Sequence, residues 1–251
     1  MGHSLYLSFL LGWQDIRQSY RRSKIGQFWI TLGMAVQIVA IGIVFGLIFK
    51  TPLDTYLPFL TVSTVIFSLF SQMLTEGVVS FPANDQMIRQ LKLPYFVHVL
   101  RSSWKVFLTF AHNFLIVPVV FIVFGKSLNF SAFLFVPGLV VAVANLLWMV
   151  SILALVAARY RDLVQIVGSL VTVLYYVTPV MWQPTALPSG LAHLLLGLNP
   201  FYHLLQITRL PLFGGIPTTE NWVASFGMLG IGWFATRMLY KNYSSRISMW
   251  L

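Results

Sequence analysis

Residues 29–49 read WITLGMAVQIVAIGIVFGLIF, an apolar stretch without a charged residue. A helix of about 17–25 such residues is long enough to cross the hydrocarbon core of a bilayer. Five more apolar stretches of similar length follow along the chain, at 57–79, 107–124, 133–157, 164–182 and 222–239. The sequence therefore predicts an all-α integral membrane protein with six transmembrane helices.

The Lys and Arg residues gather on one side of these six stretches. With the N-terminus in the cytoplasm, the cytoplasmic bases are Arg17, Arg21, Arg22, Lys24, Arg89, Lys92, Arg101, Lys105, Arg159, Arg161, Arg237, Lys241 and Arg246. Only Lys50, Lys126 and Arg209 then lie on the outer side. Because basic residues in short loops are retained on the cytoplasmic side, we expect a multi-pass protein with both termini in the cytoplasm.

The composition excludes several classes of protein. With 58% hydrophobic and 9% charged residues, the chain has too little polar surface for a soluble globule. Its net charge of +10 lies at helix ends, where bases set topology and attract lipid headgroups, so we expect no nucleic-acid partner. Cysteine is absent, the five histidines are scattered, and no two of the six acidic residues form a close pair. We therefore expect no catalytic site, no metal site and no cofactor in this chain.

The segment 183–221 differs from an ordinary connection. It contains two shorter apolar runs, at 187–198 and 201–212, each too short to cross a bilayer and too apolar for a plain loop. Pro200 lacks a backbone donor and disfavours a helical Asn199, so we place a turn there. We expect a re-entrant helix pair between the fifth and sixth spans. Such backbone at membrane depth is tolerated only against protein or a wet cavity, which implies an enclosed pathway.

The N-terminal segment has the pattern of an amphipathic helix. Phe9, Trp13, Ile16 and Tyr20 share one face at helical spacing, and charged residues occupy the rest. A helix of this kind lies in the plane of the membrane interface. It can serve as a surface anchor alone, or it can also contact a cytoplasmic partner.

The cytoplasmic connection 80–94 contains a second short helical element. Asn84 and Asp85 are residues that favour a helix N-terminus, and Pro94 marks a position where a helix has ended. We therefore expect a short capped helix between them, exposed on the cytoplasmic side.

Several groups of residues resemble the ABC-2-type export permeases, in the branch that exports polysaccharides. The residues WQDIR (13–17) and YRRSKIGQFW (20–29) resemble the family signature D(I/L)xxxYRxSxLGxxW, with Ile25 in place of the usual Leu. The residues RYRD (159–162), PVMW (179–182), LNPF (198–201) and LPLFG (210–214) are also similar. The resemblance covers essentially the whole chain, and the N-terminal signature is its most specific part.

This resemblance implies a single ABC-2 transmembrane domain over residues 1–251. In it, 1–28 form a cytoplasmic amphipathic helix and loop, 29–239 a six-span bundle, and 240–251 a cytoplasmic tail. The resemblance also implies a homodimer in the bacterial inner (plasma) membrane, docked on two copies of a cytoplasmic ABC ATPase subunit that binds ATP and Mg. The expected cargo is a lipid-linked glycan of the O-antigen type.

The same resemblance suggests three groups of site residues. An anionic substrate headgroup would enter near Arg21, Arg22, Lys24, Ile25 and Gly26. Coupling to the ATPase would involve Trp13, Asp15, Ile16, Asp85, Arg89 and Lys92. The outer gate would include Trp182, Asn199, Pro200 and Phe201.

Other functions remain open from the residues alone. An ABC-2 exporter of teichoic acid, or of a small amphiphile such as a drug or a lipid, would share this topology. A proton-coupled carrier is disfavoured, because Glu76 lies near the inner end of its stretch and we expect His112 to be neutral and bonded across helices. A membrane enzyme is disfavoured by the lack of catalytic residues. The Gly42–Gly46 pair forms a GxxxG pattern, which suits a close helix contact in a dimer.

Overall fold

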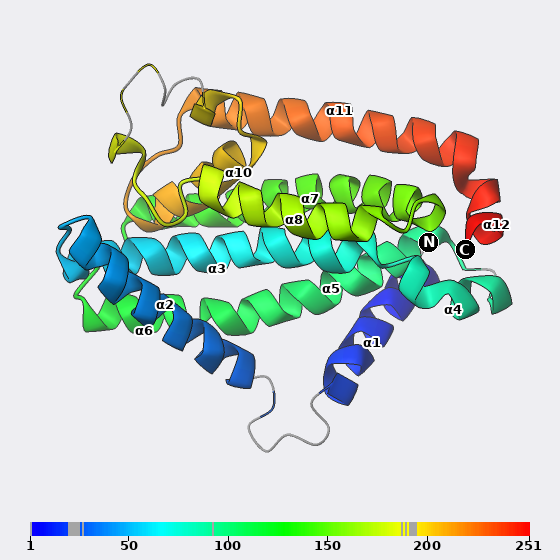
Figure 1. Ribbon diagram of the computed structural model, residues 1–251, viewed down its shortest axis with the longest axis horizontal. Helices are drawn as coiled ribbons and strands as arrows, with labels where there is room; N and C mark the ends of the chain where they lie inside the picture. Colours follow the sequence, from blue (N-terminus) through cyan, green and yellow to red (C-terminus); the bar gives the residue numbers. More distant parts are fainter. Residues whose placement is uncertain are drawn as a thin grey trace.

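The computed structural model describes residues 2–19, 26, 28–91, 93–186, 188, 190 and 195–251. Within these residues the chain consists of α-helices, short 3-10 turns and connections, and it has no strand (Figure 1). The all-α class predicted from the apolar stretches is therefore confirmed.

Long helices make up most of the molecule. They are α1 (Gly2–Ser19), α2 (Phe28–Ile48), α3 (Leu53–Val78), α5 (Tyr95–Phe114), α7 (Phe135–Arg159), α8 (Leu163–Val177), α10 (Pro200–Leu212) and α11 (Thr219–Tyr243). The shorter helices are α4 (Asp85–Gln90), α6 (Ile116–Val123) and α12 (Ile247–Trp250), and the 3-10 turns are η1 (Pro82–Asn84), η2 (Phe130–Leu134), η3 (Pro184–Ala186) and η4 (Ser244–Arg246). Figure 1 shows α3, α5, α7, α8 and α11 running along the long axis, with α1 and α2 splayed away from them.

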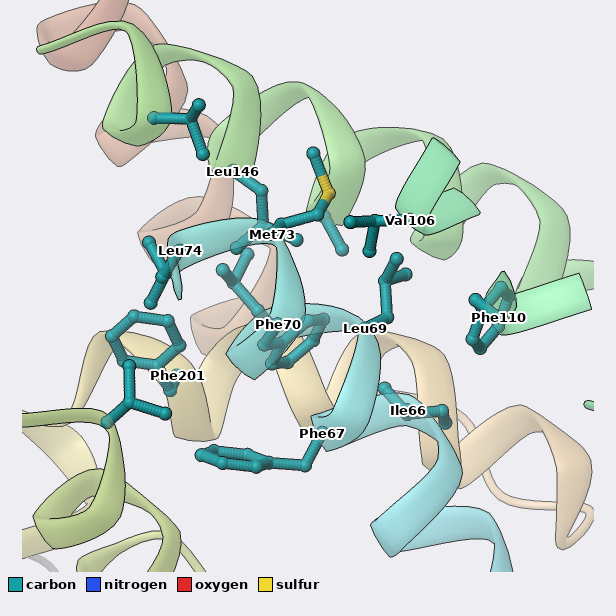
Figure 2. Packing of buried hydrophobic residues seen from close by; sticks show 14 of the residues in the cluster. Ile66, Phe67, Leu69, Phe70, Met73, Leu74, Val106, Phe110, Leu146 and Phe201 are labelled. Atoms are coloured by element: carbon teal, nitrogen blue, oxygen red, sulfur yellow. The ribbon is translucent and has the colours of Figure 1, made fainter. Parts of the chain in front are cut away.

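Helix α3 is the centre of the bundle. It contacts α2, α5, α7, α8 and α10, and its side chains are buried on nearly every face. Figure 2 shows Phe70 and Met73 of α3 among Val106 of α5, Leu146 of α7 and Phe201 of α10. The other helices therefore pack around α3.

Four of the helical stretches are long and apolar enough to cross a membrane. They are Phe28–Ile48, Leu53–Val78, Tyr95–Val123 and Phe130–Arg159, which correspond to the first four predicted spans. Helix α8 is apolar but has only 15 residues. Helix α11 has 25 residues but is less apolar and is not among the four. The fifth and sixth spans therefore stay predictions.

Prolines explain where two helices end differently from the prediction. The third span was placed at 107–124, whereas α5 already begins at Tyr95 and stops at Phe114. Pro118 cannot donate to the Phe114 carbonyl four residues earlier, and its ring would clash there. The fifth span was placed at 164–182, but α8 ends at Val177, because the residue before Pro179 disfavours helical backbone.

The basic residues keep their asymmetry in three dimensions. Both marked chain ends lie with α4 and α12 at one end of the bundle, opposite α10 (Figure 1). We call this the basic end, and its described bases are Arg17, Arg89, Arg101, Lys105, Arg159, Arg161, Arg237, Lys241 and Arg246. The segment predicted as a tail folds back here, since α12 contacts α7 and α4 and buries Ile247.

The GxxxG pattern of α2 is used inside the chain. A Cβ atom on Gly42 would lie 3.1 Å from the Leu57 side chain, and one on Gly46 would lie 2.9 Å from the Leu53 side chain. Both leucines belong to α3, so the pair brings α2 close to α3 and is not a free dimer contact. His112 also differs from the prediction: its Nδ1 lies 2.8 Å from the Leu108 carbonyl oxygen of its own helix.

Candidate functional site

A polar groove lies between α2, α3 and α8. Its volume is about 420 Å³, and its lining residues are Met34, Gln37, Thr64, Phe67, Ser68, Ser71, Gln72, Val171, Thr172, Tyr175 and Tyr176. None of these side chains carries a charge. They offer amides, hydroxyl groups and aromatic rings in the middle of helices that are otherwise apolar, which makes the groove the most distinctive chemical surface of the bundle.

The aromatic side chains of the groove form a connected set. The Phe67 and Tyr175 rings meet edge to face with centroids 5.4 Å apart, and Tyr175 and Tyr176 do so at 5.5 Å. Edge-to-face contacts of this kind fix the orientation of the rings. The buried hydroxyls of Thr64 and Tyr175 lie close enough to interact with each other. The groove therefore combines rigid ring surfaces with the exposed polar side chains of Gln37 and Thr172.

The sequence contained a signal for this groove that the prediction did not use. Thr64, Ser68, Ser71 and Gln72 recur at spacings of four, three and one along an apolar helix. This spacing places them on one face. A polar stripe on a helix buried on its other faces marks the side that contacts either water or a hydrogen-bonding ligand.

Beyond α8, the residues 178–181 form a turn that three side chains hold in place. Asn199 donates from Nδ2 to the Thr178 hydroxyl at 3.0 Å. Arg209 donates from Nη1 to the Pro179 carbonyl oxygen at 2.7 Å. The Tyr56 hydroxyl donates to the Met181 carbonyl oxygen at 2.7 Å. We call residues 178–181 the clamped segment, because α3, the start of α10 and the body of α10 all bind it.

Arg209, predicted to be one of three bases on the outer side, lies on α10, away from the basic end, and its side chain is buried. Its side chain is only 3% exposed, on α10. Besides Pro179, it donates to the Ser63 hydroxyl at 3.0 Å and to Gln206 Oε1 at 3.2 Å, and its guanidinium carbon lies 4.7 Å from the centre of the Phe59 ring. The ring face and three neutral acceptors stabilise the buried charge in place of a carboxylate.

Asn199 is the N-cap residue of α10, so a helix begins where the turn was predicted, while the re-entrant pair itself stays a prediction. The Asn199 side chain accepts hydrogen bonds from the backbone of Phe201 and Tyr202, and Pro200 occupies the first turn of α10. Both features suit a helix N-terminus. The second apolar run, 201–212, is thus a helix, whereas much of the first, 187–198, lies outside the described residues.

The other predicted gate residues lie beside this helix start. Phe201 is buried, with its ring centre 6.2 Å from that of Phe70 on α3. The Trp182 indole donates to the Tyr176 carbonyl oxygen at 2.9 Å. The predicted gate residues therefore surround the end of α8 and the clamped segment, next to the groove.

Removing the Asn199 cap should destabilise α10. Asn199→Ala should lower the free energy of unfolding by about 2 kcal/mol, because the helix loses its N-cap and Thr178 loses its donor. Asn199→Ser keeps a capping oxygen but is too short to reach Thr178, so it should lose about half as much. Thermal unfolding of the purified protein in detergent measures both. Equal losses for the two variants would contradict a capping role.

At the basic end, α1 packs against the start of α5. Ile16 is buried, and Asp15 binds Arg101 of α5 through two charge-assisted hydrogen bonds of 2.6 Å. Trp13 is 56% exposed. The predicted apolar face is therefore divided: Ile16 contacts the bundle, whereas Trp13 is free to contact lipid or a partner. Tyr20 lies outside the described residues.

The short helix predicted in the connection 80–94 is present as α4. Asn84 is its N-cap residue but does not bond the helix with its side chain. Instead its amide donates to the Ser80 carbonyl oxygen and accepts from Arg101. Asp85 and Arg89 form an ion pair on the exposed side of α4, and Lys92 lies outside the described residues.

The predicted headgroup residues fall almost entirely outside the described part of the chain. This holds for Arg21, Arg22, Lys24 and Ile25. Gly26 is described and has φ +62°, with nothing within 4 Å of an added Cβ atom. A residue with a side chain would be strained by this φ, which explains a glycine at this turn. Among the described residues, no group of acidic and histidine side chains could hold a metal ion.

The sequence of this bundle matches a known protein family. The family model described as "ABC-2 type transporter" matches residues 6–213. This chain belongs to the ABC-2 type transporter family. Members of the family are generally membrane subunits without enzymatic activity, and they typically pair with an ATPase subunit.

Three curated relatives resemble this ABC-2 permease at low identity, and each carries the name "O-antigen export system permease protein RfbA". One from Klebsiella pneumoniae is 22% identical over 190 residues, which cover 75% of this chain and 73% of the relative. One from Myxococcus xanthus is 23% identical over 197 residues, which cover 76% of this chain and 74% of the relative. A second from K. pneumoniae is 20% identical over 223 residues, which cover 88% of this chain and 85% of the relative.

Proposed function

We propose that this ABC-2 permease exports a lipid-linked polysaccharide across the bacterial inner membrane, powered by a separate ATPase subunit. The groove between α2, α3 and α8 is the observation that carries this proposal. Its amides and hydroxyls can bind sugar hydroxyls, and its rings can stack on the C–H faces of sugars. A charged or purely apolar lining would suit a charged drug or a free lipid better. The names of the three relatives support the same cargo.

In the proposed arrangement, the permease is a homodimer with six spans per protomer and both termini in the cytoplasm. The basic end then faces the cytoplasm, in accord with the retention of basic residues there. Helices α2 and α8 border the dimer axis, so that the grooves of two protomers face one shared path. The exposed apolar side chains of α8, such as Ile166, Leu170 and Val173, contact the partner protomer or lipid.

The proposed mechanism transmits ATP binding to the groove. Two ATPase subunits, which bind ATP and Mg, close on each other and move α4 and α1. This movement separates α2 and α8 across the dimer axis and opens a continuous path. The anionic headgroup of the cargo enters near Arg21, Arg22 and Lys24. A near-complete switch between the two states requires a differential binding energy of about 5.5 kcal/mol.

The packing of α2 and α8 supports their role as the moving walls. In the apolar part of each helix, only 17% of the α2 residues are buried, whereas 78% of the α3 residues are. Helix α8 buries only Val167 and Val171 within the protomer. Helices with few buried contacts move at the lowest cost, so α3, α7 and α10 serve as the fixed part of the proposed transporter.

Export in a deletion strain tests the proposal. Cells that lack the permease should lose surface glycan and accumulate lipid-linked polymer inside, and the wild-type chain should restore export. The double variant Gln37→Leu, Gln72→Leu removes two amides from the groove at similar volume. It should lower export about tenfold, since two lost hydrogen bonds together correspond to about 1.4 kcal/mol.

Thr61→Val is the matched control for this experiment. Thr61 is buried on α3, outside the groove, and its hydroxyl donates to the Leu57 carbonyl oxygen of its own helix. The control should export normally. Unchanged surface glycan in the deletion strain, with loss of a drug or free lipid from the medium instead, would favour export of a small amphiphile. Equal export by the groove variant and Thr61→Val would refute the role of the groove.

A further inference from the structure

One side chain at the basic end touches two segments that are far apart in the sequence. Arg101, near the start of α5, binds both carboxylate oxygens of Asp15 on α1 at 2.6 Å. Its other terminal nitrogen donates to Asn84 Oδ1 at 3.1 Å and lies 3.6 Å from the Met87 sulfur. Asn84 ends η1, and Met87 belongs to α4. Arg101 therefore joins α1 to the beginning of α4 through a single guanidinium group.

The contact between α1 and α5 is too close to be incidental. A Cβ atom on Gly12 would lie 2.9 Å from the Arg101 carbonyl oxygen and 3.1 Å from the Trp104 ring. The Phe9 and Trp104 rings meet edge to face with centroids 4.8 Å apart. The glycine lets the two helices pack closely. The guanidinium of Arg101 therefore has a fixed position relative to α1.

The α4 side of Arg101 is more open. A surface depression of about 600 Å³ lies beside α4 and η1, and both Asn84 and Arg101 line it. Gln86 and Gln90 of α4 are exposed. Ile88 anchors α4 in the buried cluster, and the hydrogen bond from Arg101 to Asn84 ties the start of α4 to α5.

We propose that Arg101 is a positioning residue that makes α1 and α4 move as one unit. This inference rests on the proposed function, in which both elements meet the ATPase subunits. A shift of α4 would pull on the guanidinium, which is held by Asp15, and α1 would follow. Helices α1 and α4 would then transmit the same displacement to α5 and α2.

The shape of arginine is essential for this role. A guanidinium binds a carboxylate with two parallel hydrogen bonds and still has a nitrogen that points elsewhere. A lysine keeps the positive charge, and with it the effect on topology, but its single ammonium cannot reach both partners in this geometry. Arg101→Lys therefore separates the charge of the residue from its bridging function.

Distance measurements on the permease alone test the link without any transport assay. The chain has no cysteine, so spin labels at Gln18→Cys on α1 and Gln90→Cys on α4 are specific. In the wild-type background we expect one narrow distribution of label distances. Arg101→Lys and Arg101→Met should both broaden it. An unchanged distribution in both variants would overturn the proposal.

The matched control is Lys105→Met, one turn further along α5. Lys105 also forms an ion pair with a side chain of another helix, since its ammonium lies 3.0 Å from Glu76 of α3. Among the described residues, its ammonium binds neither Asp15 nor Asn84. The distance distribution should stay narrow in this control. If it broadens as much as in the Arg101 variants, the effect is a general loosening of α5 and the proposal fails.

A double-mutant cycle then tests the link in function, in the complete complex with its ATPase and a lipid-linked glycan. Asp15→Asn and Asn84→Ala should each lower export per ATP hydrolysed about tenfold, a typical coupling effect. The double variant should be no worse than either single one, and neither change should matter further in an Arg101→Met background. Additive losses would show that the two ends act separately. If wild-type complex exports no glycan, the proposed function fails, whereas the distance result still decides the link.

Discussion

Arg209→Lys is expected to lower the free energy of unfolding more than Arg209→Met does, although lysine keeps the charge. Lysine would leave an ammonium buried on α10 that cannot reach Pro179, Ser63 and Gln206 together. A buried charge with incomplete partners costs about 4 kcal/mol of stability. Methionine removes the charge and its desolvation cost, and leaves neutral acceptors unpaired at about 2 kcal/mol. Both variants release the clamped segment, so both should lose most export.

Thermal unfolding in detergent measures the stability of the two variants, and surface glycan in complemented cells measures their export. Lys50→Met is the control, because Lys50 is an exposed base at the same end of the bundle and should change neither quantity. An Arg209→Lys protein as stable as wild type would show that the three hydrogen bonds are dispensable. An Arg209→Met protein with full export would show that the clamped segment does not need to be held.

Gly138→Ala is expected to lower the free energy of unfolding by about 3 kcal/mol, a large effect for one methyl group. The added Cβ atom would lie 2.2 Å from the Ile207 carbonyl oxygen, where α7 crosses α10. The obstacle is backbone inside a helix, so no side-chain rotation relieves the clash. The two helices must separate, and the packing around the buried Ile207 is lost with them.

Gly230→Ala on α11 is the matched control for this prediction. Nothing lies within 4 Å of its added Cβ atom, and alanine is the better helix former by about 1 kcal/mol. It should therefore be neutral or slightly stabilising. Equal stabilities of the Gly138 and Gly230 variants, measured by thermal unfolding, would contradict the close contact between α7 and α10.

Much of the fold was predictable because hydropathy and charge act over whole helices. The first four apolar stretches correspond to helices of spanning length, and the break at Asn199-Pro200 follows from the local chemistry of proline. The family was also predictable, since the N-terminal signature around Asp15 and Trp29 is specific. These features need no knowledge of which helices touch.

The remaining features depend on contacts between distant residues. Arg209 was placed on the outer side by its position in the chain, but its buried partners Ser63 and Pro179 could not be predicted. The third span was started at residue 107, after the charged residues Arg101 and Lys105, whereas α5 begins at Tyr95. Their partners, Asp15 and Glu76, lie on other helices. Single-sequence patterns do not pair such residues, whereas the polar stripe of α3 that borders the groove could have been recognised from its spacing.

The position of the groove has a consequence for how such a protein can change. Gln37, Ser68, Gln72 and Thr172 are all partly or fully exposed on the walls of the groove, whereas the buried cluster that holds α3, α7 and α10 together is built from other residues. Substitutions on the walls leave that cluster intact. If the groove binds the cargo as proposed, a lineage can acquire a different cargo through a handful of surface replacements, while its frame remains recognisable.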